Sequence, residues 1–156
     1  MKKVFTAYGV LYTAGDTIGL TDKTLSDYLM RRLVINSPLK VPVLSELGKA
    51  ISGNPDYVIG NAILMYQDVS ASGKEARLAV KVVFNEQHRK EYETILNSGK
   101  ARNRLHFGFL LSSVLHDGKG EIVDGKITAV SLNGNGLGGE VISYGWEDES
   151  DGTVSD

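Results

Sequence analysis

The residues best suited to covalent chemistry lie close together between His106 and His116. Two serines, Ser112 and Ser113, lie between these two histidines. A serine hydroxyl becomes a useful nucleophile only when an adjacent base takes its proton, and histidine is a common base. Hydrolysis by a serine nucleophile is therefore the first chemistry to consider.

The spacing argues against a re-formed serine–histidine pair inside this stretch. If residues 104–115 form a strand, side chains alternate, so His106 and Ser112 share one face and Ser113 lies on the other. His106 and Ser112 would then be about 20 Å apart at ~3.3 Å per residue, which is beyond hydrogen-bond reach. His116 is nearer to the serines, but it falls in the predicted turn that follows the strand.

Metal and nucleotide chemistry have weaker support. His88, His106 and His116 lack the close spacing of metal ligands, and no acidic pair frames them, so we expect no metal site. The segment 134–139 reads GNGLGG and matches G-x-G-x-x-G. A dinucleotide site also needs a helix starting at these glycines and an acidic residue about 20 positions later. The residues after Gly139 read as one strand and an acidic tail, so we predict a flexible loop, which could order on assembly, and no cofactor.

A local basic cluster is the candidate contact surface for a partner. It comprises Arg89, Lys90, Lys100, Arg102 and Arg104. A solvated helix face is the plain interpretation, and docking onto an acidic protein surface is the functional one. Nucleic-acid binding is not expected, because the chain has a formal net charge of −2 and a pI near 5.9. Trp146 is interpreted as a core residue or, if exposed, as an interface anchor.

Length and composition indicate one ordinary globular domain. The chain has 156 residues, of which 42% are hydrophobic and 23% charged. It has no cysteine, which excludes disulfides and thiolate chemistry and fits a reducing cytoplasm. No apolar run approaches the roughly 20 residues of a membrane span, so no membrane partner is expected.

The hydrophobic pattern predicts a β-rich fold with two helices. Strands are predicted at 3–12, 41–44, 57–67, 76–84, 104–115, 122–132 and 140–146. One helix is predicted at 22–34 with Thr21 as its cap, and another at 85–97 between Asn85 and Gly99. The last ten residues, 147–156, carry five carboxylates and no positive charge, which is typical of a mobile tail.

These elements position the candidate residues within a single α+β domain. We predict a β-rich barrel of mostly antiparallel strands with two helices at residues 1–146, followed by the acidic tail 147–156. The candidates His106, Ser112 and Ser113 then lie on one strand, and His116 lies in the turn that follows it.

The order of several short fragments resembles the prohead proteases of tailed bacteriophages, which share a β-barrel with herpesvirus assemblin. The chain opens with VFTAYGVLY, continues with Val41-Pro42-Val43-Leu44 and then has the strand opening Val58-Ile59-Gly60. A helix closed by glycine, the strand with HFGF and a strand ending in VSL follow in the same order. The resemblance extends over residues 4–132 and implies a prohead-protease-like barrel.

The same resemblance implies a catalytic histidine, serine and glutamate, and all three are missing. The histidine is expected just after the V-P segment, where Ser45, Glu46 and Leu47 stand. The serine is expected in an S-x-G-[FY] context, and here His106 occupies its position. The glutamate is expected directly before V-S-L, where this chain has Ala129. A barrel without base, nucleophile and carboxylate should not hydrolyse peptides by the family mechanism.

The resemblance and its missing groups together predict a non-catalytic bacteriophage head protein. It would be an auxiliary or decoration capsid protein on a degenerate prohead-protease fold, a pseudoprotease located in the virion after synthesis in the host bacterial cytoplasm. The expected partners are the major capsid protein or other phage head proteins, and self-association is left open. The alternative is an active prohead maturation serine protease that cleaves scaffold or capsid protein. An unrelated small β-rich binding module is the third option.

Overall fold

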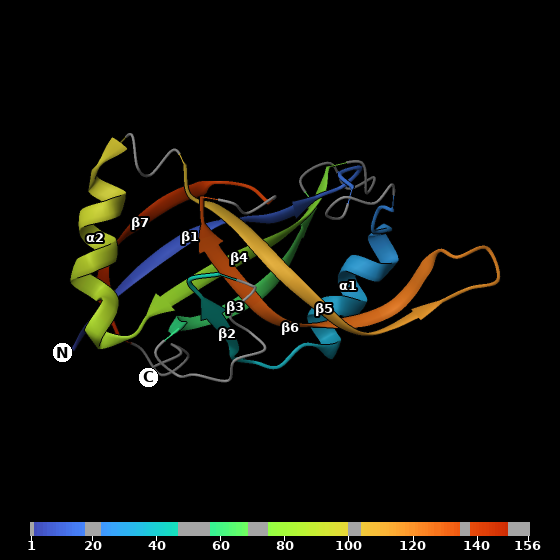
Figure 1. The fold of residues 1–156 in the computed structure, drawn as a ribbon, viewed down its shortest axis with the longest axis horizontal. Helices are drawn as coiled ribbons and strands as arrows, with labels where there is room; N and C mark the ends of the chain where they lie inside the picture. The colour runs from blue at the N-terminus through green and yellow to red at the C-terminus, as the bar shows by residue number, and fades with distance from the viewer. Residues whose placement is uncertain are drawn as a thin grey trace.

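The computed structural model describes residues 2–17, 23–46, 57–68, 75–99, 104–134 and 138–149 (Figure 1). Leu47, Lys100 and Arg102, which were singled out in the sequence, lie outside these ranges. The same holds for Thr21, the predicted helix cap.

Within the described residues, seven strands form one mostly antiparallel sheet. They are β1 (Lys3–Thr13), β2 (Val41–Leu44), β3 (Val58–Asp68), β4 (Ala76–Phe84), β5 (His106–His116), β6 (Ile122–Asn133) and β7 (Val141–Asp148). Their order across the sheet is β5-β6-β2-β3-β4-β1-β7, in which β2 and β6 are parallel. The predicted β-rich class with two helices is confirmed. It could be predicted because apolar residues alternate along the strands.

The prediction of a closed barrel is wrong, because β5 and β7 remain the two edges of the sheet. They approach each other at one corner only, where His106 forms a bridge with Glu140. The Phe107 amide donates to the Gly139 carbonyl at 3.0 Å, and the Gly138 amide donates to the Phe107 carbonyl at 2.6 Å. Beyond this corner β5 continues into a long hairpin with β6, so the two edges do not pair along their length.

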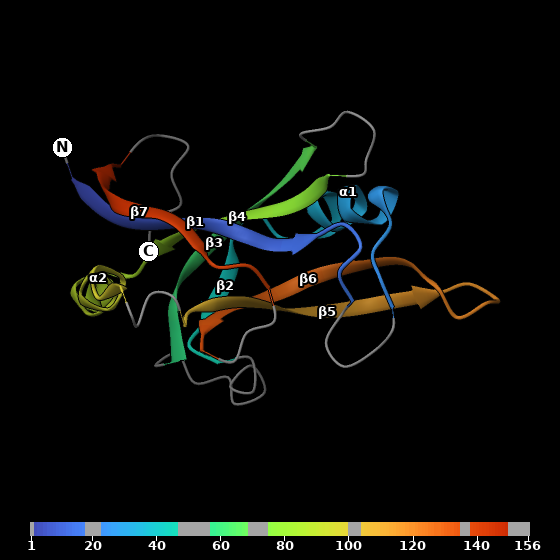
Figure 2. The same ribbon diagram turned by 90° about the horizontal axis from the view of Figure 1, so that it is seen from above.

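The sheet curls so that β1 and β4 lie over β5 and β6 (Figure 2). The apolar core fills the space between these two layers. Phe5, Leu11 and Phe84 from the first layer and Phe107 and Leu132 from the second are at most 1% exposed. Tyr12 and Phe109 meet edge-to-face across the gap, with ring centroids 6.5 Å apart.

Helix α1 (Asp27–Asn36) begins later than predicted. Its cap is Ser26, whose hydroxyl accepts a hydrogen bond from the Leu29 amide at 3.1 Å. The Leu25 amide instead donates to the Tyr12 hydroxyl at 2.9 Å, so this residue is held before the helix by a contact with β1. The helix therefore starts at the first capping residue that follows this long-range contact.

α1 also anchors the hairpin formed by β5 and β6. The Asn36 side-chain amide donates to Asp124 at 2.7 Å and to the Gly125 carbonyl at 2.8 Å, and Arg32 pairs with Asp124 at 3.3 Å. The hydrogen bond from Arg32, followed by that from the Gly125 amide, lowers the pKa of Asp124. The hairpin is thus held to α1 close to its turn, since Asp124 pairs with Leu115 near the end of β5, and the turn itself extends beyond the body of the protein (Figures 1 and 2).

Helix α2 (Arg89–Asn97) follows the short 3-10 helix η3 (Glu86–His88) and packs beside β7 and β1 (Figure 1). Tyr92 stacks on Phe84 with ring centroids 4.8 Å apart, and the Tyr144 hydroxyl donates to the Asn97 side chain at 3.0 Å. The Asn85 side chain does not cap this segment as predicted, because it donates to the Val58 carbonyl at 3.2 Å. Ser98, not Gly99, is the carboxyl cap of α2.

The buried Tyr92 should make stability fall in strongly alkaline solution. Burial raises the pKa of Tyr92 from 10.0 to about 12. The unfolded chain therefore releases this proton first, so stability is unaffected below pH 10 and declines between pH 10 and 12, by up to ~1.4 kcal/mol per pH unit. Urea unfolding at several pH values should show this decline in the free energy of unfolding. In the Tyr92→Phe variant, the decline between pH 10 and 12 should be smaller by the contribution of Tyr92. An identical decline in the variant would contradict the assignment.

The last strand extends past the predicted domain boundary at residue 146. Glu147 and Asp148 belong to β7 and form ion pairs with Lys81 and Lys3, each at 2.5 Å. The Glu149 amide donates to the Lys2 carbonyl at 2.9 Å. These carboxylates are thus neutralised strand residues, and the mobile tail stays a prediction for the residues that follow. In the described part of the chain, no helix is long and apolar enough to cross a bilayer.

Candidate functional site

The three strands that carry the family positions are neighbours in the sheet. β6 lies between β2 and β5, and one row of residues runs across all three: Leu44 on β2, Ser131 on β6 and Gly108 on β5. The end of β2 and the start of β5 therefore lie at the same end of β6. The region that the sequence singled out is assembled, although its three segments are distant in the chain.

His106 stands where the resemblance places the nucleophile, and its ring contacts the backbone. The side chain is half-buried, and its Nδ1 lies 3.3 Å from the Gly138 carbonyl oxygen. Gly138 lies on the side of β5 that faces away from β6, as its hydrogen bond to Phe107 shows. The ring is thus directed toward the open edge of the sheet.

Asn133 separates His106 from the end of β2. It is the partner of His106 in the β5–β6 pairing, and its side-chain amide donates to the Ser45 carbonyl at 2.9 Å. The two residue types are exchanged relative to the family pattern. Ser45 stands near the position expected for the histidine, and His106 stands at the position expected for the serine. Two strand spacings, about 9.6 Å, separate their backbones. Because the His106 ring bonds Gly138, the exchange does not give a serine–histidine pair.

Ala129 cannot replace the expected carboxylate. It lies opposite Leu110, is 4% exposed and has only a methyl side chain. It lies four residues before Asn133, which corresponds to about 13 Å along the strand. Leu47 lies outside the described residues. Ser45 and Glu46, which share the expected position of the base, have no imidazole with which to accept a proton.

The two serines of β5 also lack a histidine partner. The Ser112 hydroxyl pairs with the Thr128 hydroxyl at 2.8 Å. Ser113 is exposed and adopts a positive φ of 53°, which places it at an irregularity of the strand. His116 ends β5 opposite Ile122 instead of lying in the turn, and it is exposed. Within the described residues, the hydrogen bonds of these groups do not connect a serine to a histidine.

The described residues contain no group of three or more His, Asp or Glu side chains that could hold a metal ion. His88 lies 3.4 Å from Glu91, one turn along α2, and His106 and His116 lie at opposite ends of β5. The glycine-rich segment 134–139, considered above as a dinucleotide motif, has a structural role where it is described. Gly138 and Gly139 are hydrogen-bonded between β5 and β1, so this part of the predicted flexible loop is fixed in the fold.

The basic cluster is only partly a surface, and the assignment of Arg89 to a partner contact is wrong. Arg89 is 5% exposed, and its Nε donates to the Phe84 carbonyl at 3.0 Å. Its guanidinium therefore ties the start of α2 to the end of β4. Lys90 and Arg104 are exposed, whereas Lys100 and Arg102 lie outside the described residues.

Replacing Arg89 with alanine should therefore destabilise the fold. We expect a loss of about 2 kcal/mol, because the buried Phe84 carbonyl loses a charged hydrogen-bond donor. Lys90→Ala, on the next residue of the same helix, is the matched control and should change stability by less than about 0.5 kcal/mol. Urea unfolding of both variants measures the difference. Equal effects of the two substitutions would return Arg89 to the surface cluster.

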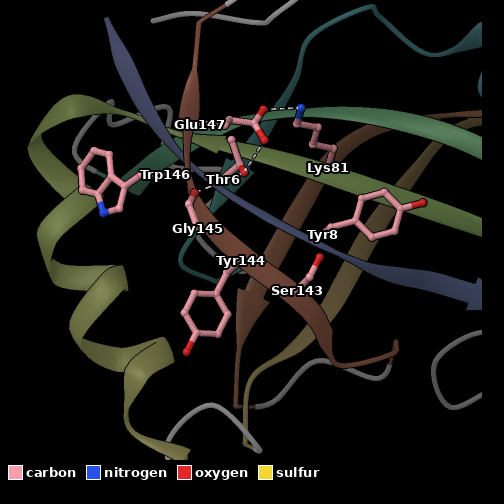
Figure 3. A pocket seen from close by; sticks show the side chains of 8 residues that line it. All are labelled: Thr6, Tyr8, Lys81, Ser143, Tyr144, Gly145, Trp146 and Glu147. Carbon is pink, nitrogen blue, oxygen red and sulfur yellow. Dashed lines mark hydrogen bonds and ion pairs between the residues drawn. The ribbon is translucent and has the colours of Figure 1, made fainter.

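A shallow groove of about 460 Å³ lies on β1, β4 and β7 (Figure 3). Its charged residues, Lys81 and Glu147, pair at 2.5 Å, and the Thr6 hydroxyl donates to Glu147 at 3.4 Å. Tyr144 and Trp146 alternate with Ser143 and Gly145 along this part of β7. The Trp146 ring lies 5.3 Å from Phe5, and its indole N–H donates to Glu93 on α2. The groove is therefore a polar surface whose two charges neutralise each other, and its lining residues include no histidine that could activate a hydroxyl. Trp146, although 42% exposed, is fixed by internal contacts.

Comparison of the chain with protein family models, with curated proteins and with solved structures found no match.

Proposed function

We propose that this protein is a non-catalytic bacteriophage head protein that binds the capsid lattice as an auxiliary or decoration subunit. In this proposal its sheet is an open variant of the prohead-protease fold that has lost the catalytic groups. The partner is the major capsid protein or another head protein, and the protein resides in the virion after synthesis in the bacterial cytoplasm.

One observation carries the proposal: the fragments that resemble the family hold packing residues, while the positions of its catalytic groups hold unsuitable ones. Val41 and Val43 of the V-P segment are completely buried. Gly60 of the I-G fragment has no room for a side chain, because an added Cβ would lie 2.4 Å from the Val83 carbonyl oxygen. By contrast, His106 bonds a backbone carbonyl and Ala129 offers no polar atom.

Retention of packing without chemistry favours a binding role over hydrolysis. Peptide hydrolysis by a serine mechanism needs a base within hydrogen-bond reach of the hydroxyl, roughly 2.6–3.2 Å. Among the described residues, the Ser112 hydroxyl does not meet this condition, since it pairs with Thr128, and the His106 ring pairs with the Gly138 carbonyl. A protein of this kind can still serve as a rigid subunit on a capsid.

The proposal is tested by quantitative mass spectrometry of particles of the phage that encodes the chain. We expect intact chains in mature particles, in a copy number that follows the number of capsid subunits. Proheads are purified and measured in parallel, because a comparison of the two kinds of particle distinguishes a lattice-bound subunit from an assembly factor. Presence in proheads and absence from mature particles would contradict the decoration role.

A second experiment addresses the alternative, an active maturation protease. The purified chain is treated with a fluorophosphonate probe, which labels activated serines, and its intact mass is followed during storage. We expect no labelling and no self-cleavage. Labelling that is abolished in a Ser112→Ala or Ser45→Ala variant would support the protease and overturn the pseudoprotease.

A further inference from the structure

The two edge strands of the sheet differ in their protection against pairing with another chain. β7 ends with Glu147 and Asp148, and although both are paired with lysines, such charged side chains on an edge discourage the addition of a further strand. β5 reads HFGFLLSSVLH and contains no lysine, arginine, aspartate, glutamate or proline. Such an apolar, uncharged edge is the arrangement that favours strand addition. β5 is therefore the less protected edge.

The backbone geometry defines which part of β5 is available. The outward N–H and C=O of Phe107 are bound to Gly139 and Gly138. Because backbone groups alternate in direction along an antiparallel strand, the next outward pairs belong to Phe109 and Leu111. A register shift between Leu110 and Leu111 skips Thr128 of β6 and adds no residue to β5, so the alternation of β5 continues through Leu111. Farther on, the positive φ of Ser113 and a second register shift, between Ser112 and Leu115, redirect the strand. Among the described residues, the usable edge is thus 108–112, with Leu110 at its centre.

We propose that this edge binds the same edge of a second copy, in an antiparallel arrangement centred on Leu110. Phe109 would pair with the partner's Leu111, and Leu111 with the partner's Phe109, so that all the outward backbone groups of these residues are satisfied. The two seven-stranded sheets would then form one continuous sheet across a twofold axis. This inference does not depend on the proposed function.

The chemistry of β5 favours a second copy over a foreign strand. In this register Leu110 faces the partner's Leu110 in a non-hydrogen-bonded pair, where Cα atoms approach to about 4.5 Å and side chains pack closely. Leu110 is 41% exposed in the single chain, so pairing removes an apolar surface from water. β5 has no charge that would select a charged partner strand, and self-pairing places no like charges opposite each other.

The shape of the protein is compatible with this contact. The β5–β6 hairpin lies at one side of the molecule and extends past the rest of the fold (Figure 2). Beyond residues 108–112, the hairpin is held to α1 by the contacts of Asp124 with Arg32 and Asn36. Residues 108–112 are held in the ladder with β6, so this edge can meet a second copy with little loss of conformational freedom. The contact is short, so we expect a dimer that dissociates in the micromolar range.

Sedimentation equilibrium of the purified full chain across the micromolar range tests the proposal. The wild type should show a monomer–dimer equilibrium. Leu110→Lys places two lysines opposite each other and should raise the dissociation constant by at least about tenfold. The matched control is Ile142→Lys on the other edge strand, where the wild-type side chain is 59% exposed. This control should dimerise as the wild type does.

Circular dichroism and urea unfolding of both variants confirm that each is folded. A wild type that remains monomeric at the highest concentration overturns the proposal, and so does a dimer that tolerates Leu110→Lys. Dissociation by Ile142→Lys alone would move the interface to β7. A monomer that binds capsid shells and loses this binding in Leu110→Lys would assign the edge to a head protein and also overturn self-pairing.

Discussion

Replacing Gly138 with alanine should destabilise the protein by about 3 kcal/mol, at the upper end of the usual cost of overpacking. An added Cβ would lie 2.6 Å from the carbonyl oxygens of both Leu11 and Phe107. These are backbone atoms of β1 and β5, so neither can move aside without displacing a strand. The same displacement would weaken the short hydrogen bond from the Gly138 amide to Phe107.

Gly145→Ala is the matched control for this substitution. Gly145 lies on β7, and an added Cβ there meets no atom within 4 Å. We expect a change of less than about 0.5 kcal/mol. Urea unfolding with the same buffer and protein concentration gives both values. If the two variants were equally stable, the segment before β7 would not be inserted between β1 and β5.

The positions of the strands could be predicted from the sequence because they depend on local alternation. β2 and β4 were predicted with the bounds that the structure has, and the other strands differ by one or two residues at an end. The closure of the sheet could not be predicted, because it depends on which distant edges pair. The bridge between His106 and Glu140 joins residues far apart in the chain. It is an isolated pair at the start of β5, and the rest of β5 continues into the hairpin with β6.

The start of α1 shows how a single long-range contact changes a local prediction. Thr21 and Ser26 are both suitable caps, and Leu25 fits the apolar face of a helix that begins at either. The hydrogen bond from the Leu25 amide to the Tyr12 hydroxyl decides between them. Tyr28, in the first turn of the helix that results, is 66% exposed.

The residue types at the candidate site could be read from the sequence, whereas their contacts could not. The absence of the expected base, nucleophile and carboxylate is evident from the sequence at residues 45–47, at His106 and at Ala129. The role of Asn133 depends on the pairing of β6 with both β2 and β5, for which the sequence gives no signal. The burial of Arg89 was missed for a related reason, since the Phe84 carbonyl that binds it belongs to the preceding strand.

Truncation of Phe84 to alanine should have the largest effect among the single substitutions considered, a loss of about 4 kcal/mol. Phe84 is completely buried at the end of β4. Its ring stacks on Tyr92 at 4.8 Å and lies 5.6 Å from Phe5, so it is a central aromatic contact between α2 and the sheet. The alanine variant loses the buried apolar surface and leaves a cavity between helix and sheet.

The loss should be concentrated in α2, and hydrogen exchange can show this. Phe84→Leu keeps part of the volume, so the variant should remain folded while the amides of α2 exchange faster than those of α1. Tyr144→Phe is the control, because it removes only the peripheral hydrogen bond to Asn97 and should cost about 1 kcal/mol or less. Uniformly faster exchange in both helices would mean that Phe84 supports the whole core and that α2 does not unfold separately. Unchanged exchange in α2 would mean that Arg89 and Trp146 hold the helix without the aromatic stack.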